Sequence, residues 1–297
     1  MKLPPFPRSP LVRILSAIVA SGGLFVLLAA IVPLPPVKPY SLVVSDRNGQ
    51  FLQAFRASDG MWRFQTPPDE IPQRFKKILI EKEDRWFYFH PGFNPVSIVR
   101  AAIQNIIHNH RVSGASTITM QVARMLEPKN RTYFNKLIQI FRAVQIELRY
   151  SKKEILEMYV SMVPLGSNIE GLKTASMIYY LSPLERLNVA QLLDLIVIPN
   201  DPNDLQPDRN PGRLYAARMR EARKLAARGV ITAEDMVVMI NTSAAATRNP
   251  LPKCAQHFCL RLRNQYPSES IIRSSLDLRL QKKIETLLSN HLRPWKL

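Results

Sequence analysis

The longest apolar stretch of the chain lies near its beginning. No residue between Ile14 and Val32 is charged, and aliphatic side chains dominate there. A helix of about 20 apolar residues is long enough to cross the hydrocarbon layer of a bilayer. We therefore expect residues 14–34 to form a transmembrane anchor.

Basic residues on one side of this stretch predict its orientation. Three of them and no acidic residue precede it: Lys2, Arg8 and Arg13. The positive-inside rule then makes residues 1–13 a cytoplasmic tail and places the rest of the chain in the periplasm. A cleaved signal peptide is the alternative, but its apolar core is usually shorter and is followed by small residues rather than by prolines.

The pattern changes from extended to helical along the remainder. Tyr40 to Val44 and Phe51 to Phe55 predict a β-hairpin within residues 37–65, with Asp46, Asn48 and Gly49 in its turn. From residue 66 to 241 apolar residues recur at helical spacing, for example at Val96, Val99, Ile103 and Ile107. Helix starts are indicated by capping residues at Asn94, Ser151, Asn188 and Thr232. A mainly α fold follows for this domain.

The C-terminal region, residues 242–297, lacks the continuous helical pattern of the preceding domain. We expect a linker over 242–267, then a strand at Ile271 to Ser275 and a helix at Asp277 to Leu292. Its two cysteines, Cys254 and Cys259, lie five residues apart, and the sequence leaves open whether they form a disulfide. Together with His257 they are too few for a structural zinc site.

The charge of the chain narrows the class of partner. The formal net charge is +18, which implies an anionic partner. The basic residues are scattered rather than clustered with exposed aromatic residues, so nucleic acid is a poor candidate. An anionic membrane surface and a phosphate bound to a lipid fit better.

Candidate chemistry begins in the segment EDRWFYFHPG, residues 83–92. An acid beside aromatic rings tends to lose solvent, which favours its use as a general base. We expect Glu83 to be that base and Asp84 to modulate the electrostatics of the site. Trp86, Phe87 and Phe89 would exclude water from the site or frame it. His90 and Gly92 would shape the turn that leads into the helix capped by Asn94. Taken alone, such a segment is more often a solvated helix end beside a buried aromatic cluster.

A second polar patch, GASTITMQVAR, covers residues 114–124. Ser116 or Thr117 would cap a helix whose free amides could face an anion. Gln121 and Arg124 would share one helix face. Arg131 could add a second guanidinium, so that two arginines stabilise a departing diphosphate. A plain capped helix with a solvent-facing arginine is the alternative.

In this order the two patches closely resemble the first two signature motifs of the peptidoglycan glycosyltransferases, the glycan-polymerising domain of class A penicillin-binding proteins. The resemblance runs from about residue 60 to 240 and includes a third segment at 131–150 and a fourth at 151–176. It implies the following site residues: Glu83 as base, Asp84, Phe87, His90 and Gly92 in the first motif, Ser116, Thr117, Gln121 and Arg124 in the second, and Arg131 as a diphosphate contact.

The resemblance also implies a fold and a reaction. Family members have a lysozyme-like helical fold, and they join lipid II units with inversion into a β-1,4 glycan, releasing undecaprenyl diphosphate. A divalent cation (Mg or Mn) is a possible cofactor, and other cell-wall synthesis proteins are possible partners. The segment 270–288 resembles the entry to a transpeptidase domain, yet no Ser-x-x-Lys occurs among the 297 residues. We therefore expect a truncated bifunctional enzyme without transpeptidase activity.

Three positions depart from the family pattern. Arg124 stands where a lysine is common, and its planar guanidinium can still bind phosphate at two points. Gln139 stands where a second glutamate is usual; it stays a catalytic candidate, although an amide carries no charge. This pattern is similar to the type 1C branch. Ser161 replaces an asparagine, where we expect an effect on packing.

Two other functions remain open. A glycan-cleaving enzyme of lysozyme type would also use a glutamate in a helical fold, but it usually needs a second carboxylate at a suitable distance. A non-catalytic remnant could bind a lipid-linked precursor or cell-wall partners and turn over poorly.

Overall fold

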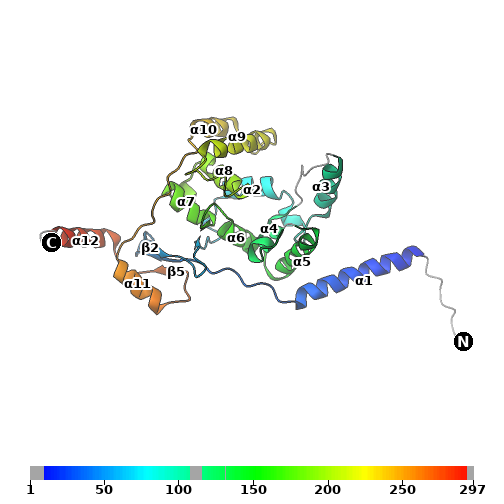
Figure 1. Cartoon of the computed structure of the whole chain (residues 1–297), viewed down its shortest axis with the longest axis horizontal. Helices are drawn as coiled ribbons and strands as arrows, with labels where there is room; N and C mark the ends of the chain where they lie inside the picture. The colour runs from blue at the N-terminus through cyan, green and yellow to red at the C-terminus, as the bar shows by residue number, and fades with distance from the viewer. Residues whose placement is uncertain (1–9, 108–115, 131, 293–297) are drawn as a thin grey trace. The chain divides into compact units, whose positions relative to one another are not determined.

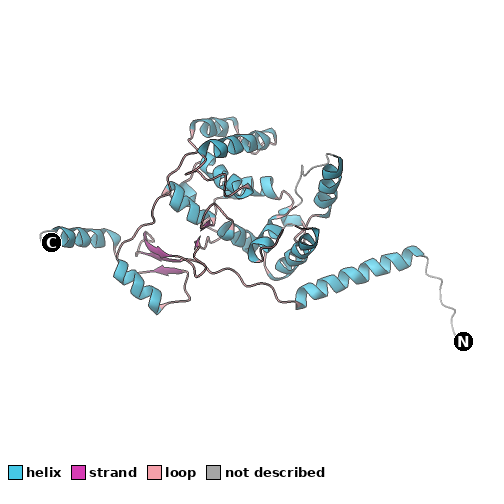
Figure 2. Ribbon diagram, in the orientation of Figure 1, coloured by secondary structure: helices cyan, strands magenta, loops and turns pink. Residues whose placement is uncertain are grey.

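The structure is a computed structural model of the chain, and it describes residues 10–107, 116–130 and 132–292 (Figure 1). Helices make up most of these residues, as expected for a mainly α protein (Figure 2). The chain divides into two compact units. The first unit contains Met1–Val37 and Trp86–Ile155, and the second contains Lys38–Arg85 and Leu156–Leu297.

The first unit is helical. Its elements are α1 (Pro10–Ile31), η1 (Phe87–Phe89), α3 (Pro95–Ile107), α4 (Ile118–Leu126), α5 (Tyr133–Arg149) and the start of α6 (Lys152–Met162). The Asn94 side chain accepts a hydrogen bond from Ser97 N at 3.1 Å, which confirms the predicted cap of α3. Ser151 and Glu154 form the predicted reciprocal cap of α6.

The apolar helix α1 is fixed at its C-terminal end by α5. Arg142, Gln145 and Arg149 all donate hydrogen bonds to carbonyls between Ala29 and Pro33. Cationic and amide donors suit this end because the last carbonyls of a helix lack intrahelical partners and carry partial negative charge. By length and composition, α1 could cross a membrane, as the sequence predicted.

Apolar side chains of α3 and α5 lie on the surface of this unit. The exposed fractions are 58% for Val99 on α3 and 65% for Leu137 on α5. Val144 on α5 is buried, so the apolar side chains of α5 are divided between the interior and the surface. The helical period was read correctly, but it did not reveal which apolar face is covered.

The second unit has a helical body and a small sheet. The elements of the body are α2 (Gln73–Glu83), most of α6, α7 (Leu172–Tyr180), η2 (Leu184–Arg186), α8 (Val189–Val197), η3 (Ile198–Asn200), α9 (Pro211–Ala227), α10 (Ala233–Asn241), and the paired short strands β3 (Trp62–Arg63) and β4 (Ile169–Glu170). Capping boxes at Asn188 and Thr232 open α8 and α10, as predicted.

The small sheet joins the two ends of the second unit. Strands β1 (Leu42–Ser45) and β2 (Phe51–Phe55) form the predicted antiparallel hairpin. Strand β5 (Ile271–Arg273) pairs parallel to β1, and α12 (Leu278–Leu292) follows it. The sequence pattern predicted the hairpin and the C-terminal strand separately, whereas in the structure they form one sheet.

A helix lies within the stretch expected to be only a linker. Helix α11 (Gln256–Gln265) packs its Cys259 into a core shared with Leu42, Leu52 and Leu278. Both cysteines are free thiols, so the disulfide that the sequence left open is not formed. Burial raises the pKa of the Cys259 thiol to about 11.

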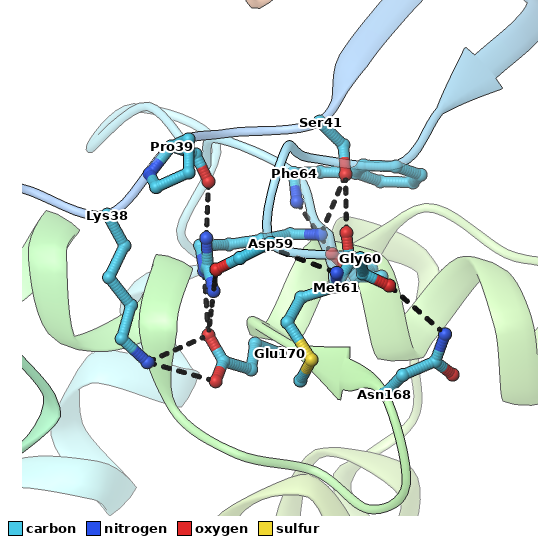
Figure 3. A network of polar contacts seen from close by, with 11 residues as sticks. Lys38, Pro39, Ser41, Asp59, Gly60, Met61, Phe64, Asn168 and Glu170 are labelled. Carbon is cyan, nitrogen blue, oxygen red and sulfur yellow. Dashed lines mark hydrogen bonds and ion pairs between the residues drawn. The ribbon is translucent and has the colours of Figure 1, made fainter. Parts of the chain in front are cut away.

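Arg63, which has no solvent contact, connects β3 to β4 and to the segment before β1. Figure 3 shows its partners Pro39, Asp59 and Glu170. Arg63 Nε donates to Glu170 Oε2 at 2.6 Å, and its other nitrogens bond to Asp59 and to the carbonyl of Pro39. Lys38 also pairs with Glu170, at 3.1 Å. These bonds compensate a buried charge that would otherwise be costly.

Candidate active site

Glu83 is the last residue of α2, in the second unit. The helix is held by Phe75, Ile78 and Leu79, which are buried, and it packs against α8 and α9. Asp84 caps the helix, and its amide donates to Ile80 O at 2.9 Å. The predicted base therefore stands at the end of a rigid element rather than on a loop.

Lys82 positions the Glu83 carboxylate. Its Nζ contacts Glu83 Oε1 and also donates to Ile196 O at 3.1 Å and Asn200 Oδ1 at 3.3 Å. The exposed fractions of the two side chains are 7% for Lys82 and 14% for Glu83. The lysine is thus tied to the end of α8 and to η3, and it restricts where the carboxylate can lie. The sequence pattern did not indicate a role for Lys82.

The rest of the first motif lies in the first unit, where Phe87 and His90 are buried. The ammonium of Lys152 lies 4.8 Å from the centre of the Phe87 ring and donates to His90 O at 2.7 Å. Trp86 and Phe89 are mostly exposed, with exposed fractions of 57% and 80%. Of the three aromatic residues expected to exclude water, only Phe87 is enclosed.

A close backbone approach joins the first motif to the second. Gly92 has φ of 94°, and a Cβ there would lie 2.7 Å from Ala143 O on α5. Thr117 Oγ1 donates to Gly92 O at 2.6 Å, and His90 Nδ1 accepts from Gly92 N at 3.2 Å. Only glycine fits this conformation and this distance. The turn predicted for His90 and Gly92 is confirmed.

Thr117, not Ser116, caps α4. Its hydroxyl accepts from Met120 N at 3.1 Å. Most of the helix surface is buried, whereas Gln121 is half-buried and Arg124 is exposed. These two polar side chains therefore lie away from the buried face, as their spacing of three predicted.

Ser116 has a different partner, Lys136, which the sequence pattern did not indicate. Lys136 Nζ donates to Ser116 Oγ at 2.6 Å and to Gln139 Oε1 at 2.9 Å. One cation thus connects the second motif with the third. Its position three residues before Gln139 on a predicted helix was the available signal. Arg131, the other expected cation, lies outside the described residues.

These residues do not fit a divalent cation at Gln139. The side-chain oxygen of Gln139 accepts a hydrogen bond from the Lys136 ammonium, whose positive charge would repel a metal ion. Gln139 itself supplies no carboxylate. Among the residues that the structure describes, no group of three His, Cys, Asp or Glu side chains is placed to hold a metal.

The comparisons with known proteins decide the family. The transglycosylase family model matches residues 48–228, which include all the motif residues above. The chain belongs to the transglycosylase family.

Curated relatives of this transglycosylase chain are penicillin-binding proteins. Penicillin-binding protein 1C of Escherichia coli is 36% identical over 264 residues, which cover 89% of this chain and 34% of the relative. Penicillin-binding protein 4 of Bacillus subtilis is 32% identical over 64% of this chain and 31% of the relative. The chain therefore spans about a third of the length of these relatives.

A solved structure, penicillin-binding protein 1A from Haemophilus influenzae, matches with a TM-score of 0.41 and 12% identity, over 88% of this chain and 30% of that chain.

The fourth motif of this transglycosylase chain is well packed at its unusual serine. Ser161 is fully buried, and its Oγ accepts from Thr66 N at 3.0 Å. The Gly171 position lies against Ser161 O, where an added Cβ would come within 2.5 Å. The serine therefore satisfies a buried donor, and its polar group is not left unmatched.

Proposed function

We propose that this chain is a membrane-anchored inverting glycosyltransferase that polymerises lipid II into β-1,4 glycan strands and releases undecaprenyl diphosphate. The observation that carries the proposal is the position of Lys136, which connects Ser116 and Gln139 within a chain of the transglycosylase family. This position places a cation between the second and the third motif, where it can stabilise the charge of a departing diphosphate.

Each candidate site residue has its own role in the proposed reaction. Glu83 accepts the proton of the acceptor sugar hydroxyl as this oxygen attacks the anomeric carbon of the donor. The bond from that carbon to the diphosphate breaks, and Lys136, Arg124 and Arg131 stabilise the charge that develops on the leaving group. Gln121 donates a hydrogen bond to the substrate, and Gln139 orients Lys136.

The anchor and the surface of the first unit support a membrane location. Helix α1 is long and apolar enough to span a bilayer, and α3 and α5 expose apolar side chains. In this proposal the N-terminus is cytoplasmic and the catalytic residues lie in the periplasm, next to the lipid-linked substrate.

A polymerisation assay tests the proposal. The full chain in non-ionic detergent would receive labelled lipid II, and glycan length would be measured by gel electrophoresis. We expect polymer from the wild type and a loss of about 10²-fold or more in Glu83→Gln. Lys136→Gln should lose rate as well, whereas the exposed Lys283→Gln, with the same change in net charge, should not.

Other outcomes would contradict specific parts of the proposal. Shortening of preformed glycan would support the lysozyme-type alternative, and binding of lipid II without product would support the non-catalytic one. Polymerisation by Glu83→Gln at the wild-type rate would reject Glu83 as the base. We expect no covalent adduct with a fluorescent penicillin, because the 297 residues contain no Ser-x-x-Lys.

A further inference from the structure

A cavity in the second unit lies among residues that have no role in the proposed reaction. It has a volume of about 240 Å³. Its walls come from the end of β2, from Trp62 on β3, from Ile178 on α7 and from the segment 248–253. These parts are far apart in the sequence and all belong to the same unit.

The charged side chains around this cavity are all basic. They are Arg56, Arg248 and Lys253. Within the described part of the chain, none of the three forms an ion pair with a carboxylate. All three residues are exposed, and together they give this cavity a positive potential that would attract an anion.

Two of these cations are already oriented. The Arg248 guanidinium donates to Asn168 Oδ1 at 2.5 Å, and the Asn168 side chain in turn donates to Gly60 O (Figure 3). The Arg56 guanidinium lies 5.4 Å from the centre of the Trp62 ring. A guanidinium placed by a neutral partner keeps donors for an incoming oxyanion.

The wall formed by the segment 248–253 is held in place. Asn249 donates to Ile178 O through both its backbone amide, at 2.9 Å, and its side chain, at 3.1 Å. Pro250 and Pro252, which follow it, have fixed φ angles. Less conformational entropy is therefore lost when a ligand binds here.

The size and the apolar walls decide between an inorganic ion and an organic one. A water molecule occupies about 30 Å³ in the liquid, so this cavity holds a group several times larger than a small ion. Trp62, Ile178 and Leu251 offer apolar contact next to the cations. We propose that this cavity binds the carboxylate end of a short acidic peptide, with one or two residues of the peptide lying on the apolar walls.

Titration calorimetry on the full chain in non-ionic detergent tests the proposal. The probes are acetyl-alanyl-glutamate, its uncharged diamide and inorganic phosphate. We expect the peptide to bind, its affinity to fall as salt is added, and the diamide to bind about tenfold or more weakly. Arg248→Gln and Lys253→Gln should each weaken peptide binding about five- to tenfold.

Control variants separate the cavity from the overall charge of the chain. Lys283→Gln on α12 removes the same charge outside the cavity and should leave binding unchanged. Trp62→Leu should weaken the peptide more than phosphate, because both ligands use Arg56 beside the ring but only the peptide also uses the aromatic wall. Equal binding of phosphate and peptide, or unchanged affinity in Arg248→Gln and Lys253→Gln, would overturn the proposal.

Discussion

Arg63 illustrates how a single residue connects segments that are distant in the sequence. It has no exposed surface, and its partners Pro39, Asp59 and Glu170 come from three separate stretches of the chain. A buried pair contributes little relative to apolar residues of similar size, but removing one partner leaves a charge without compensation.

We expect Arg63→Met to lower the free energy of unfolding by about 3 kcal/mol or more, because Glu170 stays buried next to Lys38 alone. The double variant Arg63→Met with Glu170→Met should recover much of this loss. Thermal unfolding in detergent measures both. Arg85→Met, which removes a mostly exposed arginine, is the matched control; an equal loss in this control would contradict the argument.

A second buried pair predicts a pH dependence. Asp194 and Arg218 are both inaccessible to solvent and lie 2.8 Å apart. Burial raises the pKa of Asp194 from its ordinary value of 3.8 to about 7, although the guanidinium of Arg218 opposes this shift. The folded state therefore binds this proton more tightly than the unfolded chain does.

The free energy of unfolding should consequently fall as the pH rises from about 4 to about 7, and this contribution should be level above that range. Asp194→Asn keeps an acceptor for Arg218 and should remove this part of the slope. Unfolding measured across this pH range, with the exposed Asp69→Asn as control, tests the prediction. The idea fails if Asp194→Asn and wild type show the same slope.

At the scale of elements, the small sheet depends on β5. This strand covers one edge of β1, and Leu278 and Cys259 complete the core beneath it. An uncovered strand edge presents free backbone donors and acceptors to other chains.

A chain that ends at residue 267 should therefore melt at a lower temperature and aggregate faster than one that ends at 292, because it lacks both β5 and Leu278. Melting temperature and light scattering measure these effects. A chain ending at 292 but carrying Leu278→Ala separates the core from the edge: it should lose about 2–5 kcal/mol without the same gain in aggregation.

The local signals of these elements were strong where a side chain caps a helix. Asn94, Thr117, Asn188 and Thr232 all cap helices as their sequence context indicated. The sequence pattern did not indicate helix α11. Its N-cap residue is Ala255, which has φ of 49° and forms no side-chain capping hydrogen bond. A helix without a capping residue gives no such start signal.

On the scale of the whole molecule, the net charge and the exposed apolar faces make a joint prediction. A chain lacking residues 1–34 should still bind vesicles that contain anionic lipid, and binding should weaken with added salt. Vesicle sedimentation measures this.

The double variant Val99→Asp with Ile103→Asp should reduce this binding by about fivefold or more, since it places charge on the exposed face of α3. Val237→Asp with Ile240→Asp makes the same change of charge on α10 in the second unit and is the control. Equal effects of the two double variants would show that charge alone, not the face of α3, governs binding.

The sequence by itself determined what depends on neighbouring residues. The apolar span, the helix caps, the hairpin turn and the order of the motifs are all encoded within short stretches, because hydrogen bonds of caps and turns join residues a few positions apart. The roles of the site residues remain predictions that the assays above test.

Only the tertiary structure decided the contacts between distant stretches. The pairing of β1 with β5 joins residues more than 200 positions apart, and Arg63 reaches Glu170 across 107 positions. Lys136 meets Ser116 for the same reason, since α5 must pack on α4 before the two side chains can bond. Such contacts depend on how helices and strands pack, and no local pattern specifies that.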